Sequence, residues 1–348
     1  MEIDEYQSLV YDCGSSHERT RLMDELYVVG AGGIGCAVAY ALIAAGIAPA
    51  IVESDPRKIA AGAKGHLRVA GSLPRPARFV AFGAWQPSAR STILLCTKCY
   101  DNAQVLARVP AGATLVPIQN GFDPGLTTLS HEFEGVASFV SECDRDRPWT
   151  RITRPGDLHL GRRQSTGRRE TRPQVFDALR RSGLFRTIEV RDIEPFKHAK
   201  LMYNAAISPI AATGGVDNGR LLSDPSARRL FFDLLGENFR ILSAAGIELG
   251  RVGPLRPETV ARILRRRWLA TAMGRFFEPS LRGTYCSMAG DIERGRTEVE
   301  NYNGHLIRLA RSAGVPCPLN EAAFDLVRSM TARGQRPSTA AWRLLAAA

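Results

Sequence analysis

A pattern of three glycines near the start of the chain constrains the fold more than any other feature of the sequence. Gly30, Gly32 and Gly35 follow a short apolar run at 26–29 and open an apolar stretch at 34–45. In such a strand–turn–helix the first glycine permits a tight turn, the second lets the backbone approach a pyrophosphate, and the third lets helix and strand pack closely. The free N–H groups at the helix start favour an anion. We therefore expect a dinucleotide-binding loop formed by Gly30, Ala31, Gly32, Gly33, Ile34 and Gly35.

A carboxylate downstream bears on the choice of dinucleotide. A second apolar run ends in Glu53, near the distance from the glycines at which a ribose-binding carboxylate is expected. Such a carboxylate accepts hydrogen bonds from the adenosine ribose and repels a 2′-phosphate, and Asp55 adds to that repulsion. Arg57 and Lys58 are close enough in sequence to bind a phosphate instead. On these residues we expect NADH rather than NADPH.

The apolar runs further along predict the fold class. Strand-like runs stand at 67–70, 79–82, 92–96, 114–118 and 136–140, and helical or loop segments separate most of them. Strands that alternate with helices form a largely parallel sheet with helices on both faces. We expect an α/β protein with a Rossmann-type, doubly wound parallel sheet.

The pattern changes in the second half of the chain. A turn at 155–157 separates two short strands, and a helix at 172–182 and a strand at 185–190 follow. From there the pattern is helical, with helices expected at 195–212, 225–245, 257–268, 289–313 and 320–333. This division predicts an extension at 1–24, a dinucleotide-binding domain at 25–192, a mostly α-helical substrate domain at 193–336, and a tail at 337–348 that is a short helix or frayed.

Composition narrows the classes of function. The chain has 348 residues, of which 45% are hydrophobic and 23% charged, as in a folded protein of about two domains. It lacks an apolar run of roughly 18–20 residues and a secretory core, so we expect a cytoplasmic protein with no membrane partner. Seven cysteines, an odd number, are spread along the chain. We expect no disulfide framework and no metal site, with Cys96 and Cys99 as buried, reduced thiols.

The basic charge is almost entirely arginine. The net charge is +11, and only five of the 46 basic residues are lysines. The arginines are scattered and no aromatic residues interleave with them, which favours solvated faces over a nucleic-acid surface. The few lysines are therefore candidates for work that arginine cannot do, because a guanidinium does not release its proton at any working pH.

Three further stretches carry a family resemblance. They are Cys96-Thr97-Lys98 with Ile118-Gln119-Asn120-Gly121; Lys200 to Pro209; and Ser287-Met288, Asp291-Ile292, Thr297-Glu298 and Asn303-Gly304. In this order, and with the glycine pattern, they resemble the ketopantoate (2-dehydropantoate) reductase family over residues 25–333. The resemblance implies a Rossmann domain, an α-helical domain, and catalysis in the cleft between them. It also implies the NADPH-dependent reduction of ketopantoate to pantoate in pantothenate biosynthesis.

The resemblance implies roles for single residues. Lys200 stands where the family has its general-acid lysine, and Lys98 and Asn120 match the lysine and asparagine that face the cofactor and the cleft. The substrate-contacting positions are matched by Asn204 and Asn218, by Ser208 where some members have asparagine, and by Ser287 and Glu298 on the far wall. Glu298 either orients Lys200 or binds a substrate hydroxyl, and the sequence leaves both open.

Apart from the resemblance, the reduction of a ketone itself requires residues of these types. Hydride delivery to a ketone carbon leaves an alkoxide, which a positioned cation able to donate a proton stabilises. Lys200, Asn204 and Ser208 are spaced by four, so one face of a helix presents all three. Lys197 is the rival acid on the same helix, but the family pattern of a lysine with asparagine four residues later fits only Lys200.

Several departures from the family leave the substrate open. The spacing from Asp291 to Glu298 is one residue shorter, and Phe122 is expected to place a bulky ring beside the cofactor site. The leading hypothesis is a reductase of a small-molecule 2-oxo acid, with ketopantoate first among candidates. An imine- or opine-type dehydrogenase on the same frame is the alternative, followed by a non-enzymatic dinucleotide-sensing or nucleic-acid-binding protein. We expect no nucleic-acid partner, and the sequence allows a homodimer.

Overall fold

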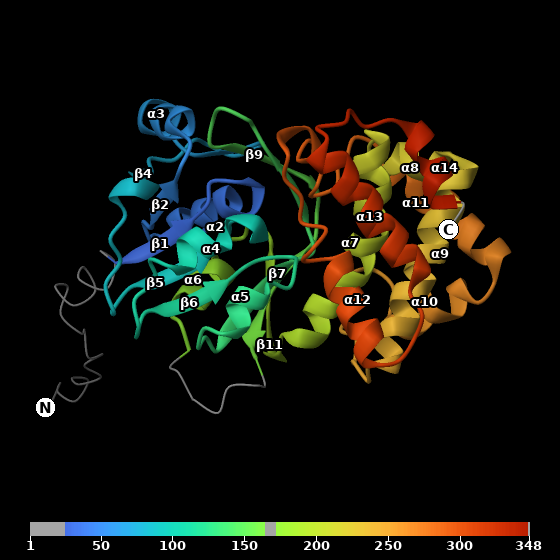
Figure 1. Cartoon of the computed structure of the whole chain (residues 1–348). Helices are drawn as coiled ribbons and strands as arrows, with labels where there is room; N and C mark the ends of the chain where they lie inside the picture. The colour runs from blue at the N-terminus through green and yellow to red at the C-terminus, as the bar shows by residue number, and fades with distance from the viewer. Residues whose placement is uncertain (1–24, 164–171, 347–348) are drawn as a thin grey trace, which may run out of the picture.

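The computed structural model describes residues 25–163 and 172–346, so the expected extension at 1–24 lies outside the described residues. The first half of the chain forms sheets with flanking helices, and the second half forms a helical body beside it (Figure 1). Among the described helices, none is long and apolar enough to cross a membrane.

A parallel five-stranded sheet carries the glycine loop. Its strand order is β4-β2-β1-β5-β6, and every neighbouring pair is parallel. The strands and connecting helices are β1 (Leu26–Val29), α2 (Gly33–Ala44), β2 (Ala50–Glu53), α3 (Pro56–Gly65), β4 (Arg78–Ala81), β5 (Thr92–Leu95), α4 (Asn102–Leu106) and β6 (Thr114–Pro117). The strand order reverses between β1 and β5, and a crevice for ligands forms at such a point, beyond the carboxyl ends of the strands. The expected fold class is confirmed.

Two small sheets complete the first half. One joins β7 (Phe133–Ala137), β10 (Asp157–Arg162) and β11 (Arg186–Asp192), and the other joins β3 (Arg68–Val69), β8 (Val140–Cys143) and β9 (Trp149–Arg154). The short helix α5 (Pro124–Thr127) precedes β7, and α6 (Val175–Arg181) precedes β11. An isolated bridge between Ile118 and Gly135 connects β7 to the parallel sheet.

Two strands expected from the sequence differ from the strands observed in these small sheets. The run at 136–140 is not one strand, because the chain leaves β7 where Ser138 N–H donates to the Asp157 carbonyl (2.8 Å), and β8 begins afterwards. The run at 67–70 shrinks to the two-residue β3, which pairs with β9 instead of entering the parallel sheet.

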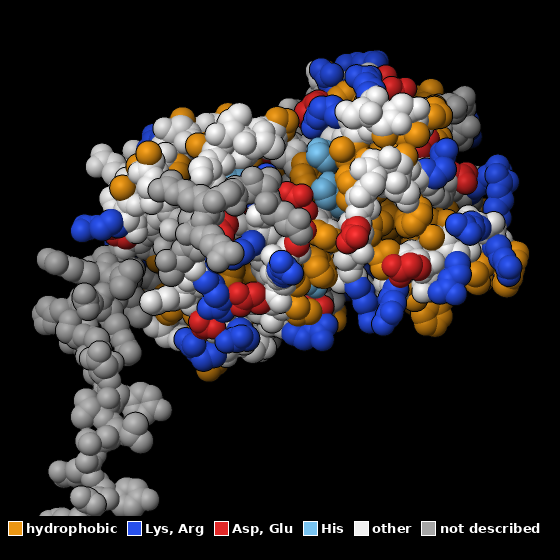
Figure 2. Space-filling model, turned by 90° about the horizontal axis from the view of Figure 1, so that it is seen from below, with side chains coloured by type: hydrophobic (Ala, Val, Ile, Leu, Met, Phe, Trp, Pro, Cys, Tyr) orange, Lys and Arg blue, Asp and Glu red, His pale blue; other side chains and the backbone are white. Residues whose placement is uncertain are grey.

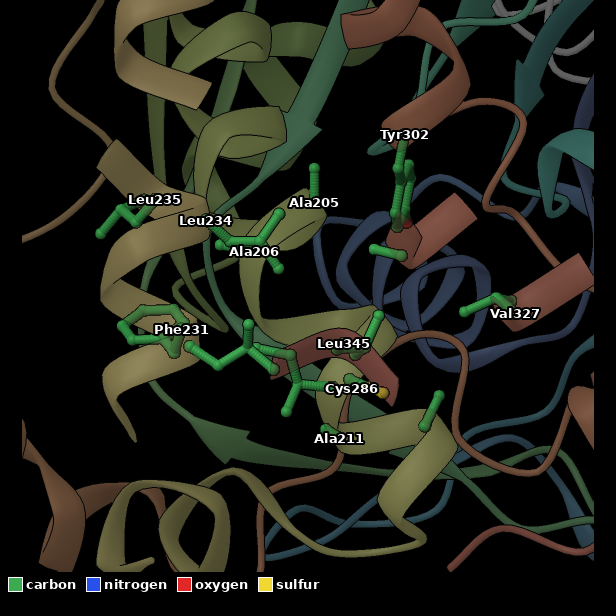
Figure 3. Close-up of a cluster of buried hydrophobic side chains, with 14 of the residues drawn as sticks. Ala205, Ala206, Ala211, Phe231, Leu234, Leu235, Cys286, Tyr302, Val327 and Leu345 are labelled. Carbon is green, nitrogen blue, oxygen red and sulfur yellow. The ribbon is translucent and has the colours of Figure 1, made fainter. Parts of the chain in front are cut away.

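The second half is helical, as expected. Its helices are α7 (Glu194–Gly214), α8 (Asn218–Ser223), α9 (Pro225–Ala244), α10 (Pro257–Leu264), α11 (Arg267–Leu281), α12 (Asn303–Ser312), α13 (Pro318–Ala332) and α14 (Trp342–Ala346). Their apolar faces meet in one core, where Phe231 of α9, Ala206 of α7 and Val327 of α13 are buried (Figure 3). The expected tail ends in α14, and its Leu345 belongs to this core.

In the helical half, two helices expected from the sequence differ from those in the structure. The helix expected at 289–313 is wrong, because Gly290 and Gly295 adopt left-handed φ angles of 73° and 68°. The described structure has only a short 3-10 helix (Ile292–Arg294) and then α12 in this range. The helix expected at 257–268 ends at Leu264, and the longer α11 that follows it was missed.

Candidate active site

A cleft of about 780 Å³ lies between the two halves. One wall is the glycine loop together with the segments that follow β5 and β6, and the other is α7 with the segment that precedes α12. The cleft therefore occupies the crevice at the reversal of strand order, where open α/β sheets bind ligands.

The glycine loop has the shape that a pyrophosphate requires. Gly30 adopts a φ of 99°, which lets the chain turn from β1 into α2. A Cβ at Gly32 would meet nothing within 4 Å, so the backbone there faces open space. A Cβ at Gly35 would lie 1.8 Å from the Gly30 carbonyl oxygen, so only glycine permits this approach. Among the described residues, no side chain caps the start of α2, which leaves its N–H groups for an anion.

Glu53 is held at the end of β2 by backbone donors. Its carboxylate accepts hydrogen bonds from the N–H groups of Ala31 (3.0 Å), Ser54 (2.7 Å) and Asp55 (2.9 Å). The two cations that follow have other partners: Arg57 pairs with Asp55 and Asp146, and Lys58 donates to the Ala31 carbonyl (2.9 Å). The end of β2 beside the loop thus presents a fixed negative charge, and the two basic residues that follow it, Arg57 and Lys58, have partners of their own.

Helix α7 provides the opposite wall. Lys200, Asn204 and Ser208 all line the cleft, as their spacing predicts. Ser208 is almost completely buried, and Pro209 follows it inside the helix. The three side chains therefore lie along one face of a helix packed against the helical core.

The Lys200 ammonium is the most perturbed cation of the cleft wall. Burial, and then the nearby positive charge of Arg154, lower the pKa of Lys200 to about 8. In the described part of the chain, this ammonium makes no hydrogen bond and no ion pair. An acid whose pKa lies near working pH is suited to donating a proton.

Two asparagines lining the cleft have unused acceptors. The amide oxygens of Asn120 and Asn218 are buried and, among the described residues, have no hydrogen-bond partner. Asn218, which lines the cleft, donates from its amide nitrogen to Thr284 Oγ1 (3.3 Å), while its amide oxygen has no described donor. Buried polar atoms are normally satisfied, so these oxygens indicate a place for a ligand.

Lys98 connects the two halves across the cleft. Its ammonium forms an ion pair with Asp291 and donates to the Ser287 carbonyl (2.5 Å). Ser287 Oγ lies 3.0 Å from the Tyr302 hydroxyl, which in turn donates to Glu298 (3.3 Å). Burial raises the pKa of Glu298. Both Glu298 and Lys200 line the cleft, and no described hydrogen bond or ion pair joins them.

Lys197 has a different environment from its neighbour. It forms a buried ion pair with Glu134 on β7, and Glu134 also lies 2.7 Å from His131 Nε2. Although burial opposes ionisation, Lys197 and His131 lower the pKa of Glu134 to about 2. Lys197 therefore links α7 to β7 and does not line the cleft.

The structure brings together nearly all of the expected site residues. All of them line the cleft except Gly35, which packs behind the loop. The expectation for Phe122 is corrected: its ring stacks against His198 and His305, at centroid distances of 4.4 and 4.3 Å, and does not line the cleft.

The sequence analysis did not single out three residues that contact or lie near the expected site residues. Asp291 was part of a quoted motif, and a buried acid that matches the charge of Lys98 was the available signal. Tyr302 lay inside a wrongly expected helix, and Arg154 ends β9, far from α7 in sequence. For these two, the sequence offered no signal.

A Rossmann-type sheet whose glycine loop faces a lysine-bearing helix across a cleft defines a two-domain, dinucleotide-dependent oxidoreductase. The family model described as "Ketopantoate reductase PanE/ApbA" matches residues 26–160, and its C-terminal counterpart matches 192–331. The chain belongs to the ketopantoate reductase family, whose members are NADPH-dependent oxidoreductases. Because the family consists of enzymes, this membership favours an enzyme over the non-enzymatic dinucleotide-sensing or nucleic-acid-binding protein.

A curated relative agrees with this assignment, and two solved structures share the fold. The chain is 27% identical to the 2-dehydropantoate 2-reductase of Archaeoglobus fulgidus over 314 residues, which cover 88% of this chain and 98% of that protein. A PanE/ApbA family ketopantoate reductase from Ralstonia eutropha JMP134 shares the fold with a TM-score of 0.69 and 23% identity, covering 89% of this chain and all of the other. D-mandelate dehydrogenase, solved with NADH and anilino(oxo)acetate, gives 0.71 and 17% with the same coverage.

Proposed function

We propose that this protein reduces the ketone of a small 2-oxo acid, with ketopantoate as the first candidate, and that Lys200 is the general acid. The observation that carries the proposal is the Lys200 ammonium, which lines the cleft without an anionic partner in the described residues and has a pKa lowered to about 8. Relatives named 2-dehydropantoate 2-reductase support the choice of substrate.

The chemistry follows from the two walls of the cleft. The glycine loop and the free N–H groups of α2 would hold the pyrophosphate of the cofactor, and a bound reduced nicotinamide supplies the hydride. Lys200 donates a proton from Nζ to the carbonyl oxygen, which becomes the hydroxyl of the product. Its positive charge also stabilises negative charge that develops on that oxygen before the proton arrives.

The remaining polar groups bind and orient the substrate. Asn204, Ser208 and Asn218 line the cleft together with Lys200 along α7 and the start of α8, and Ser287 also lines it. Glu298 has no described contact with Lys200, so of its two expected roles we propose that it accepts a hydrogen bond from a substrate hydroxyl. Asn120 adds an amide from the cofactor side.

We propose NADH as the preferred cofactor, although the family uses NADPH. Support comes from the Glu53 carboxylate, which three backbone N–H groups hold at the end of β2, and from Arg57 and Lys58, which have partners of their own. A 2′-phosphate placed there would meet a negative charge.

The deciding experiment follows the absorbance of reduced nicotinamide with purified protein, NADH and NADPH, and a panel of 2-oxo acids that includes ketopantoate. A parallel panel adds primary amines. Turnover of a 2-oxo acid alone supports the proposal, whereas turnover only with an amine present would replace it with the imine- or opine-type reaction. No oxidation of either cofactor with any panel member would contradict both.

A further inference from the structure

Two cysteines from distant parts of the chain meet beneath the glycine loop. Cys36 lies in α2, directly after the third glycine, and Cys143 ends β8. Their Sγ atoms are 3.9 Å apart. Cys36 is fully buried, whereas Cys143 is half-buried and lines the cleft. Since bonded sulfurs are about 2.05 Å apart, a movement of about 2 Å would join them.

A lysine makes the two thiols chemically different. Lys58 Nζ lies 3.6 Å from Cys143 Sγ, and both groups donate to the Ala31 carbonyl oxygen. The hydrogen bond from Cys36, together with the charge of Lys58, lowers the pKa of the Cys143 thiol despite its burial. The contact with Cys143 and complete burial raise the pKa of Cys36 well above its usual value. Cys143 is therefore the thiol that ionises more readily, and its thiolate form is the nucleophile, whereas Cys36 stays a thiol.

We propose that Cys143 and Cys36 form a peroxide-sensitive pair whose disulfide weakens dinucleotide binding at the glycine loop. The inference rests on the proposed function only in that the loop binds a nicotinamide dinucleotide. The thiol chemistry stands on the contacts of the two cysteines with Lys58 and Ala31.

The reaction balances with hydrogen peroxide as the oxidant. The Cys143 thiolate attacks one peroxide oxygen, the O–O bond breaks, and a sulfenic acid and one water form after protonation. The Cys36 thiol then attacks the Cys143 sulfur, the S–O bond breaks, and a disulfide and a second water form. Two thiols are oxidised and one peroxide is reduced, so no further reactant is needed.

The geometry connects this bond to the loop. A disulfide removes the S–H donor that Cys143 gives to the Ala31 carbonyl. It also draws β8 toward α2, where the two backbones already approach closely. A Cβ at Gly33 would already lie 2.6 Å from the Ser141 carbonyl oxygen. The shift must therefore displace the loop on which the pyrophosphate rests.

The test treats the full-length protein with hydrogen peroxide and maps its disulfides by peptide mass spectrometry. Affinity for NADH and NADPH is measured by nicotinamide fluorescence before oxidation, after oxidation, and after dithiothreitol. We expect a Cys36–Cys143 linkage, affinity weakened by about tenfold, a factor well above the error of such titrations, and full recovery on reduction.

Variants separate the two cysteines. Cys36→Ser should leave a sulfenic acid on Cys143 that dimedone traps, whereas Cys143→Ser should give neither the linkage nor a trapped adduct at Cys36. Lys58→Met should slow alkylation of Cys143 by iodoacetamide near neutral pH and move its profile to higher pH. Cys317→Ser, which removes a buried thiol from the helical half, is the matched control and should behave as the unmodified protein.

The outcomes distinguish the two proposals. A protein that binds a dinucleotide but forms no Cys36–Cys143 linkage, or forms it without loss of affinity, overturns this inference and leaves the proposed function standing. A reduced protein that binds neither NADH nor NADPH overturns the proposed function, and with it the regulatory part of the inference.

Discussion

Two lysines of α7, three residues apart, have opposite surroundings. Lys197 is paired with a buried carboxylate, whereas Lys200 has only a second cation, Arg154, as its charged neighbour in the described structure. Sequence spacing alone places both near one helical face. They differ because Lys197 faces β7, whereas Lys200 lines the cleft.

Replacement of Lys200 by alanine should lower kcat by roughly 10²–10⁴, the usual contribution of a general acid. In the unmodified protein, the reduction rate should fall as the pH rises through about 8, because the ammonium is the proton-donating form and the pKa of Lys200 is about 8. Steady-state kinetics from pH 6 to 10 measure both effects. A flat profile, or full activity in Lys200→Ala, would remove this residue from the mechanism.

Arg154 should tune that profile. Replacement by leucine removes a positive charge that lowers the pKa of Lys200, so the alkaline limb of kcat/KM should move to higher pH. Arg151→Leu is the matched control, because Arg151 is an exposed residue of the same strand and pairs with Glu142 (3.3 Å). An identical limb in Arg154→Leu and in the control would show that Arg154 does not act on Lys200.

Glu53 should set the cofactor preference. Glu53→Gln keeps an acceptor for the backbone N–H groups but removes the negative charge, so the ratio of kcat/KM for NADPH to that for NADH should rise by about tenfold, equivalent to ~1.4 kcal/mol. The ratio is read from initial rates with each cofactor at saturating 2-oxo acid. An unchanged ratio would mean that the charge of Glu53 does not face the ribose.

Helix α7 forms one wall of the cleft and also connects the helical half to the sheets. Its Lys197–Glu134 pair joins it to β7, and Asn238 on α9 donates to the Met202 carbonyl (2.9 Å) from the other side. The helix that carries Lys200 is thus held from both sides, which fixes where its ammonium lies relative to the glycine loop.

Lys197→Met should destabilise the protein by about 3–5 kcal/mol, because it leaves Glu134 buried without its ammonium partner. Activity per folded molecule should change little. Lys200→Met should show the reverse, with activity lost and stability kept, since it removes a buried cation that has no described anionic partner. Urea unfolding and active-site-normalised rates distinguish the two, and equal stability losses would contradict the assignment.

Local and non-local features explain how far the sequence predicted these elements. The β1–α2–β2 unit was correct because glycine positions and apolar runs are local signals. The helix expected at 289–313 failed because its apolar spacing continues across Gly290 and Gly295, whose left-handed geometry depends on packing. Motif order pointed to residues that, apart from Gly35, line one cleft, but the Lys98–Asp291 pair spans 193 residues and no local pattern encodes it.

At the scale of the whole molecule, charge is spread rather than concentrated. The face seen in Figure 2 has Lys and Arg side chains over both halves, with acidic and uncharged side chains between them. Histidines occur near the junction of the halves, where His198 and His305 flank Phe122. The homodimer that the sequence allows stays a prediction.

The molecule should lose stability in mild acid. Burial lowers the pKa of His198 to about 4 and of His305 to about 3, below the usual 6.5. The unfolded chain therefore takes up protons below about pH 6.5 that the folded chain refuses, and stability falls as the pH drops from there toward 4. Thermal unfolding between pH 7 and 4 measures this dependence. His305→Phe should flatten it, whereas His66→Asn, at an exposed position, should leave it unchanged.

Helix α14, the last described helix, contacts the helix that carries Lys200, although it lies far from the cleft residues in sequence. Trp342 inserts its indole against the far end of α7, where its Nε1 donates to the Ile210 carbonyl (2.9 Å), and a Cβ at Gly214 would lie 2.6 Å from the ring. A chain that ended before Trp342 would lack the indole that packs against α7, the helix that carries Lys200. A deletion at the carboxyl terminus would then register as a fall in turnover, far from any residue that touches the substrate.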